Sequence, residues 1–242
     1  MENRLIKIKE YTQAALDTLL VTRSQFALLE PLMKSETLKN RFSGGLRAQA
    51  RNIMISTLYL DCSLSLLAIS LDPGERAASI FKILCMLEAQ DLRCCLRDKF
   101  SEPPTIYDLS SMCESERGWL MRKCEQQEST NRKQEFDEIY EYVKKKFDQL
   151  KNGEVYLRLK NTRDKVHAHK EMAMGQVYPR LRTVEEFGVK VGDLKIFVDA
   201  VEELLINLQT IINNSNTSLH IINKQYKTMA EEFWEIETGS SQ

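Results

Sequence analysis

Apolar residues recur at helical spacing along almost the whole chain. The first stripe repeats every three or four residues and consists of Leu5, Ile8, Thr12, Ala15 and Leu19. A second helical run follows over residues 24–34. Because residues three and four apart share one face of a helix, we expect these stripes to pack against a common core.

The most apolar stretch follows Ser43–Gly45 and reads NIMISTLYLDCSLSLLAISL over residues 52–71, with Asp61 as its one charge. Its length would allow it to cross a membrane. Its four serines, one threonine and one aspartate would be costly in lipid, however. We therefore expect a helix buried in a protein core, ending near Asp72–Gly74.

The middle of the chain alternates between clear and weak patterns. Residues 80–87 carry apolar side chains at helical spacing, and Ser79 is placed to cap that helix. The pair Pro103–Pro104 interrupts the chain, and residues 101–118 show no clear period. We expect a long loop there, with short helical pieces.

Helical patterns return after this loop. Residues 119–131 are polar, charged and compatible with a helix, and residues 136–150 restore an apolar period. Gly153 fits the end of that helix, so the next helix should begin around Glu154.

The last third holds the strongest pattern. Asp193 can cap a helix whose apolar residues alternate four and three apart, namely Phe197, Val201, Leu204, Leu208 and Ile211. The final segment repeats this spacing with Leu219, Ile222, Tyr226, Met229, Phe233 and Ile236. Such helix pairs build bundles, so the sequence predicts an all-α antiparallel helical bundle.

Composition is that of an ordinary globular domain. The 242 residues are 43% hydrophobic, and the formal charge of -1 excludes a global basic field that would attract nucleic acid or membrane. Since no linker divides the chain, we expect one domain over residues 1–237 and a disordered tail over residues 238–242. His220 stands alone at a helix start, where we expect a surface or capping residue.

The cysteines favour a reducing compartment. They have irregular spacing without CxxC, at Cys62, Cys85, Cys94, Cys95, Cys113 and Cys124. Charges at Arg4, Lys7 and Lys9 interrupt any apolar leader at the N-terminus. We therefore expect free thiols and a cytoplasmic protein without a membrane partner.

Residues 158–182 differ from the rest of the chain in charge. Two acidic residues, Asp164 and Glu171, face seven basic ones, which gives a net charge of +5. The basic residues are Arg158, Lys160, Arg163, Lys165, Lys170, Arg180 and Arg182. A solvated helix face is the simpler interpretation, and a surface that binds the phosphates of RNA is the alternative.

Two histidines lie within this segment, in RDKVHAHK at residues 163–170. On a helix, His167 and His169 would point about 160° apart, which argues against shared metal ligation. No cofactor motif is present, so we expect neither a metal nor a cofactor. Arginine and histidine beside a polyanion can cleave RNA without a metal, because histidine exchanges protons near neutral pH.

Arg163-Asp164-Lys165-Val166-His167-Ala168-His169 resembles the signature of the HEPN superfamily, an arginine followed four to six residues later by histidine. The stretch from Leu64 to Leu87 is similar to the early helices of the abortive-infection AbiU-like branch. The resemblance implies a four- to five-helix core with extra helices and a homodimer that brings two Arg-His elements into one cleft. In many members it also implies metal-independent RNase activity in phage defence or toxin–antitoxin systems.

Carried onto this chain, the resemblance implies that Arg163 holds a phosphate, His169 serves as acid or base, and Asp164 orients its neighbours. Helical geometry alone favours His167, which would lie about 40° from Arg163, against about 120° for His169. A dimer removes the conflict, because the two groups need not meet on one helix. His167 remains the secondary candidate.

One position departs from the family pattern. Many toxin members carry a tyrosine two residues after the histidine, where a nucleotidyltransferase partner attaches AMP, and this chain has Glu171 there. An antitoxin or nucleotidyltransferase partner is therefore an open question. Other members of the superfamily are non-catalytic modules that bind nucleotides or mediate interactions, which is the alternative to the RNase.

Overall fold

The computed structural model describes residues 1–102, 114–164, 172–173, 180–181, 188, 190, 192–215 and 218–236, with the backbone alone at 114–121 and in the two short strands. The elements in chain order are α1 (Glu2–Lys34), α2 (Glu36–Arg41), α3 (Gly45–Leu71), α4 (Ile80–Leu87), α5 (Gln90–Phe100), α6 (Glu114–Lys151), α7 (Glu154–Thr162), β1 (Met172–Ala173), β2 (Arg180–Leu181), α8 (Asp193–Asn213) and α9 (His220–Phe233).

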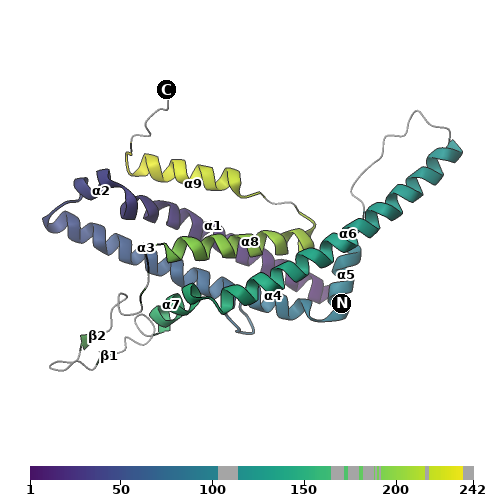
Figure 1. The fold of residues 1–242 in the computed structure, drawn as a ribbon, viewed down its shortest axis with the longest axis horizontal. Coiled ribbons are helices and arrows are strands. Elements are labelled where there is room, and N and C mark those ends of the chain that lie inside the picture. Colours follow the sequence, from purple (N-terminus) through teal and green to yellow (C-terminus); the bar gives the residue numbers. More distant parts are fainter. Residues whose placement is uncertain are drawn as a thin grey trace.

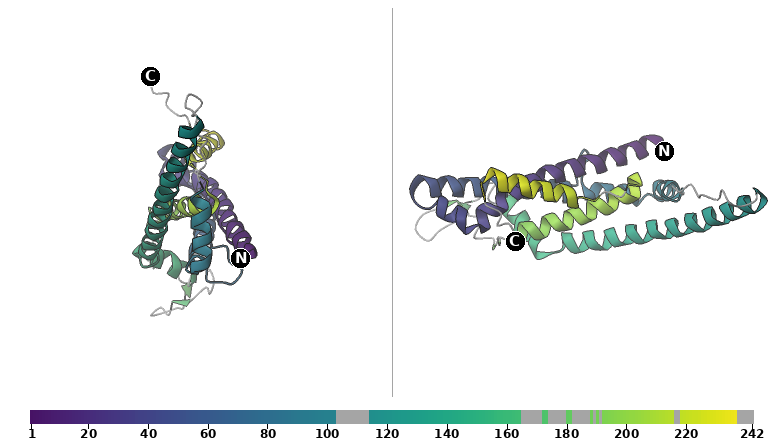
Figure 2. Two further views of the ribbon diagram at one scale, coloured as in Figure 1. Left: turned by 90° about the vertical axis from the view of Figure 1, so that its right-hand side faces the viewer. Right: turned by 90° about the horizontal axis from the view of Figure 1, so that it is seen from above.

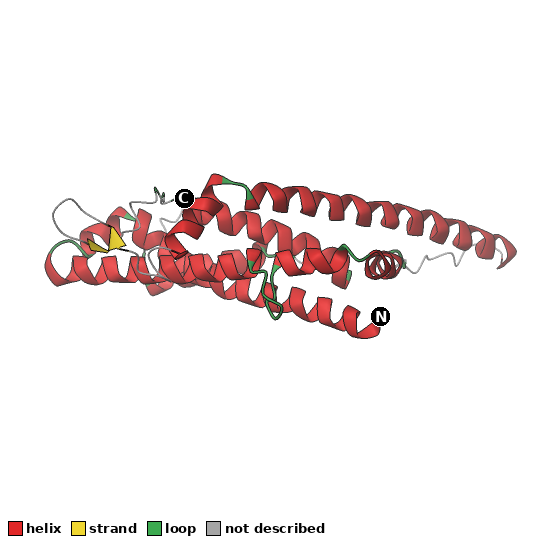
Figure 3. Ribbon diagram, turned by 90° about the horizontal axis from the view of Figure 1, so that it is seen from below, coloured by secondary structure: helices red, strands yellow, loops and turns green. Residues whose placement is uncertain are grey.

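The long helices form an antiparallel bundle, as the sequence predicted. Helix α1 packs against α3, α8 and α9, while α6 packs against α8 on the other side. In Figure 1, α1 and α9 run in one direction and α3 and α8 in the other. The first part of α6 extends beyond the other helices, which is visible from above in Figure 2. Figure 3 shows that helix accounts for nearly all of the regular structure in the described residues.

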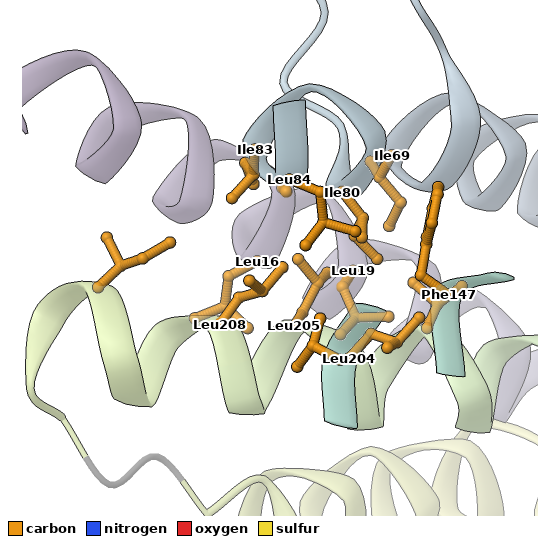
Figure 4. Close-up of a cluster of buried hydrophobic side chains, with 14 of the residues drawn as sticks. Leu16, Leu19, Ile69, Ile80, Ile83, Leu84, Phe147, Leu204, Leu205 and Leu208 are labelled. Atoms are coloured by element: carbon orange, nitrogen blue, oxygen red, sulfur yellow. The ribbon is translucent and has the colours of Figure 1, made fainter. Parts of the chain in front are cut away.

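Helix α1 is one continuous helix of 33 residues, whereas the sequence suggested two successive runs. The predicted stripe is buried, and it continues through Thr22, Phe26 and Leu29 without a break. Leu16 and Leu19 meet Leu204, Leu205 and Leu208 of α8 in the core, with Ile69, Ile80 and Phe147 completing the cluster (Figure 4). Five helices therefore contribute to a single apolar core.

Helix α3 begins at Gly45 and ends at Leu71, close to the predicted bounds. Its second half is buried, including Cys62, Leu66 and Ser70, but its first half is largely exposed. The expectation of a core helix is therefore correct for the second half alone. Within the described chain it is the one helix long and apolar enough to cross a membrane, by length and composition only, and 33% of its most apolar window is buried.

Helix α4 starts where the sequence predicted. Ser79 Oγ accepts a hydrogen bond from the backbone N–H of Lys82 at 3.2 Å and donates one to the carbonyl oxygen of Asp72 at 2.6 Å. The sequence did not separate α5 from α4, although Ala89 interrupts the helix between them. Pro103–Pro104 lies outside the described residues.

Helix α6 unites the two runs that the sequence placed at 119–131 and 136–150, and it ends at Lys151. Gly153, expected to stop this helix, is the residue that precedes α7, with an ordinary negative φ of -75°. Phe136, Tyr140, Val143 and Phe147 form its buried side.

The predicted buried residues are correct for α8 and wrong in part for α9. All five predicted apolar residues of α8 are buried, but Gly192 rather than Asp193 is its N-cap residue. In α9 the predicted stripe is wrong in part, because Met229 is 38% and Phe233 66% exposed. Ala230 and Trp234 are buried instead, and the Trp234 indole donates a hydrogen bond to the carbonyl oxygen of Leu28 at 3.0 Å.

A two-residue antiparallel pair, β1–β2, joins Met172 to Leu181 and Ala173 to Arg180 in register. The sequence did not predict it, and it does not alter the all-α class. The predicted disordered tail at residues 238–242 lies outside the described residues, so that expectation stays a prediction.

Candidate functional site

Helix α7 leads directly into the Arg-His element, whose first residue, Arg163, is the C-cap residue of the helix. It begins at Glu154, as predicted, and packs against α3, α6 and α8 through residues that include Leu159 and Thr162. The α-helix ends at Thr162, and its C-cap residue, Arg163, keeps right-handed helical backbone angles.

Arg163 and Asp164 contact each other directly. The Arg163 Nε donates to Asp164 Oδ1 at 2.7 Å, and Nη2 lies 2.6 Å from the same oxygen. Their side chains are 37% and 34% exposed. The carboxylate therefore lies along one edge of a guanidinium that solvent still reaches, and the role of Asp164 in orienting Arg163 stays a prediction.

Arg158, five residues earlier, faces the interior. Its Nε and Nη2 donate to the two carboxylate oxygens of Asp193 at 2.8 Å each, and Nη1 donates to Glu154 at 3.2 Å. The Arg158 side chain is 18% exposed and that of Asp193 3%. Hydrogen bonds from Arg158 hold the pKa of Asp193 below its usual range, and Asp193 raises the pKa of Arg158. This pair ties α7 to the first turn of α8.

Tyr59 of α3 lies beside the same pair. Burial and the nearby Asp193 carboxylate raise the pKa of Tyr59, and its hydroxyl oxygen is buried without a hydrogen-bond partner among the described residues. The sequence missed the Arg158–Asp193–Tyr59 cluster, because its members come from three helices. The available signal was Asp193 itself, whose carboxylate was assigned to helix capping.

A groove of about 310 Å³ lies between α6, α7 and α8. Its lining includes Arg158 and the stacked rings of Tyr156 and Phe197, whose centroids are 6.5 Å apart. Ile196, 59% exposed, lies at this groove. The groove is therefore lined on one side by the aromatic rings of Tyr156 and Phe197 and also contacts Arg158.

The remaining predicted site residues are placed only in part. Lys160 is half-buried on α7, and Arg180 lies in β2, where the backbone alone is described. The others lie outside the described residues, namely His167, His169, Lys165, Lys170, Glu171 and Arg182. The pairing of Arg163 with either histidine therefore stays a prediction, as does RNA contact by any of these residues.

The third histidine lies at the surface and the described cysteines are free thiols, as the sequence predicted. His220 is the exposed first residue of α9. The described cysteines are free, with Cys62 buried and Cys85 and Cys94 exposed, and burial raises the pKa of Cys62 to about 12. Among the described residues there is no group of three or more His, Cys, Asp or Glu side chains that could hold a metal ion.

Comparison with known proteins places the chain in a family. The family model of AbiU2, a HEPN family, matches residues 5–233. No curated protein matches the chain, and no solved structure matches it. Because the family match covers nearly the whole bundle, from the first turns of α1 to the end of α9, the chain belongs to the AbiU2 family of HEPN proteins.

Proposed function

We propose that this protein is a HEPN-type RNA-binding protein and a metal-independent endoribonuclease that acts as a phage-defence or toxin effector. The observation that carries the proposal is Arg163, which lies at the end of α7 with its guanidinium partly exposed and held along one edge by Asp164. Membership of the AbiU2 family supports it.

The chemistry requires three groups. A neutral histidine takes the proton of the ribose 2′-hydroxyl, whose oxygen forms a bond to phosphorus. The bond from phosphorus to the 5′-oxygen breaks, and a protonated histidine supplies the proton to that oxygen. Arg163 neutralises the charge that develops on the phosphorane. The products are a 2′,3′-cyclic phosphate and a 5′-hydroxyl, and no oxidant, reductant or metal is consumed.

We assign the acid–base role to His169 and the phosphate-holding role to Arg163. A single copy supplies one of each, whereas the reaction uses a base and an acid. Two copies related by a two-fold axis would supply both histidines, and a dimer is therefore part of the proposal.

The test is incubation of the purified protein with mixed RNA in excess EDTA, followed by analysis of the RNA termini. We expect cyclic phosphate ends. Arg163→Ala and His169→Ala should each reduce cleavage ~100-fold or more, the scale of losing an acid–base group, and His167→Ala should reduce it much less.

His220→Ala is the matched control, because this histidine is exposed at the start of α9 and outside the proposed site. Its activity should equal that of the wild type. If His167→Ala is inactive and His169→Ala retains activity, the assignment of the histidines is wrong. Intact RNA at high protein concentration would favour the alternative, a non-catalytic module that binds RNA or nucleotides.

A further inference from the structure

A second groove, of about 460 Å³, lies where α1, α8 and α9 meet. It shares no lining residue with the groove beside α7. Four acidic and three basic side chains line it, so negative charge is in excess by one. Between the charged residues its wall is apolar and aromatic, formed by Phe26 and Ala27 of α1 and by Tyr226 and Ala230 of α9.

One end of this groove is a charged network that joins all three helices. Arg23 of α1 donates from Nε to Glu202 and from Nη2 to Asp199 at 2.8 Å, both on α8. Asn223 Nδ2 of α9 donates to the two carboxylate oxygens of Glu202 at 3.0 and 3.3 Å. The side chains of Arg23 and Glu202 are 12% and 14% exposed. We call these four residues the Arg23 network.

Oxygen atoms beside the network lack donors. Glu202 fixes the orientation of the Asn223 amide, because a carboxylate accepts from Nδ2 and repels Oδ1. Asn223 Oδ1 is then buried without a hydrogen-bond partner among the described residues. On α1, Pro31 has no N–H, so the carbonyl oxygen of Ala27 lacks the donor that a helix normally supplies. Surplus acceptors favour a ligand that carries N–H donors.

The other end of the groove holds two further carboxylates, Glu30 of α1 and Glu231 of α9. Each pairs with a lysine on its own helix, Lys34 at 2.6 Å and Lys227 at 3.7 Å. These lysines are 57% and 77% exposed, so both ion pairs are weak and a cation in the groove can replace them. Seven residues separate Arg23 from Glu30, which places the two ends about 10 Å apart along α1.

We propose that this groove binds a linear polyamine, with one ammonium group between Glu30 and Glu231 and another beside the carboxylates of the Arg23 network. Ammonium groups donate hydrogen bonds and accept none, so they match the carboxylate, amide and carbonyl oxygens of the groove. The methylene chain between them packs on Phe26 and Tyr226, and the tyrosine ring also attracts a cation. Extended spermidine has a length comparable to the separation of the two ends.

Binding of this kind would tie α9 to the rest of the bundle, because the ligand contacts α1, α8 and α9 at once. The protein should therefore unfold at a higher temperature with spermidine, and the amides of α9 should exchange hydrogen more slowly. The proposal does not rest on the proposed function, since no lining residue of this groove belongs to the Arg-His element.

Calorimetric titration of the whole chain with spermidine tests the proposal. We expect one site per chain that persists at physiological salt. An alkanediol of the same length lacks the ammonium groups, and magnesium chloride lacks the methylene chain, so neither should bind there. Putrescine is too short to span both ends and should bind ~10-fold more weakly, as expected for the loss of one charged contact.

Glu231→Gln and Glu232→Gln form a matched pair, because each removes one negative charge from α9 and Glu232 is exposed outside the groove. Glu231→Gln should weaken spermidine binding ~10-fold, and Glu232→Gln should leave it unchanged. Asp199→Asn tests the other end and should also weaken binding ~10-fold. It should fold, since the contact between Arg23 and Glu202 remains, and circular dichroism would check this.

Three results would overturn the proposal. The first is no binding heat and no rise in unfolding temperature at ~1 mM spermidine. The second is equal affinity of Glu231→Gln and Glu232→Gln, or displacement of spermidine by magnesium, since either shows general charge screening. The third is slower hydrogen exchange outside α1, α8 and α9 alone, which would place the ligand elsewhere.

Discussion

The structure makes Arg158 a structural residue, and this can be tested by replacing it with alanine. The Arg158→Ala substitution leaves the Asp193 carboxylate, whose side chain is 3% exposed, without its two hydrogen bonds of 2.8 Å. Removal of one partner from a buried ion pair costs about 3–5 kcal/mol, because the remaining charge stays buried. The Tyr59 hydroxyl lies beside the pair without a hydrogen-bond partner among the described residues, and a neutral hydroxyl does not replace the positive charge that is lost with Arg158.

The assay is urea unfolding followed by circular dichroism at pH 7. With an m-value of about 2 kcal/mol per molar urea, the midpoint should fall by about 1.5–2.5 M. Glu154→Ala is the control, because Glu154 is 89% exposed and its contact with Arg158 should contribute less than about 1 kcal/mol. The double variant Arg158→Met/Asp193→Leu should recover most of the loss, since no unpaired charge remains.

The same pair predicts a pH dependence. Arg158 lowers the pKa of Asp193 in the folded protein, so the pair stabilises the protein above the ordinary aspartate pKa of about 3.9 and stops doing so as the pH falls through the lowered value. The difference in unfolding free energy between the wild type and Arg158→Ala should therefore shrink below about pH 4. If Arg158→Ala lowers the unfolding free energy by less than about 1 kcal/mol at pH 7 and also binds RNA more weakly, the structural role of Arg158 is refuted.

Three further predictions concern the core, a cap and the thiols. Leu19→Ala should lower the unfolding free energy by about 2–5 kcal/mol in urea titrations, whereas the exposed Val21→Ala should change it by less than about 0.5 kcal/mol. Ser79→Ala removes the cap of α4 and should cost about 0.5–2 kcal/mol by the same measurement. Cys62 should react with a thiol reagent only after unfolding, whereas Cys85 should react at once.

The spacing of apolar residues predicts the buried side of a helix only where that side lies against the core along the whole helix. The stripes of α1 and α8 were correct because one side of each helix lies against the core along its length. After Tyr226, the apolar pattern of α9 can continue through Met229 and Phe233 or through Ala230 and Trp234, and periodicity cannot choose between these two registers. Trp234 is selected by contacts that the local sequence does not contain, namely the carbonyl oxygen of Leu28 and the edge of Phe42.

The net charge of the candidate site was also predicted from local sequence alone, which does not contain long-range contacts. Counting residues 158–182 gave a net charge of +5, which treats every basic residue as facing one surface. Asp193 lies 35 residues beyond Arg158 and neutralises it across a helix pair. Long-range ion pairs of this kind are set by how the helices pack, so a local count overstates the positive charge available to an anionic ligand.

The contrast between the two described arginines decides how variants of this segment have to be interpreted. Arg158 holds α7 to α8, and Arg163 follows five residues later at the end of the same helix. Under the proposed function, loss of Arg158 should displace Arg163 and reduce RNA cleavage without any contact between Arg158 and RNA. Arg163→Ala should leave the urea midpoint nearly unchanged, because its ion pair with Asp164 is about one third exposed on both sides. Cleavage lost together with stability identifies a positioning residue, and cleavage lost at full stability identifies a group that contacts the substrate.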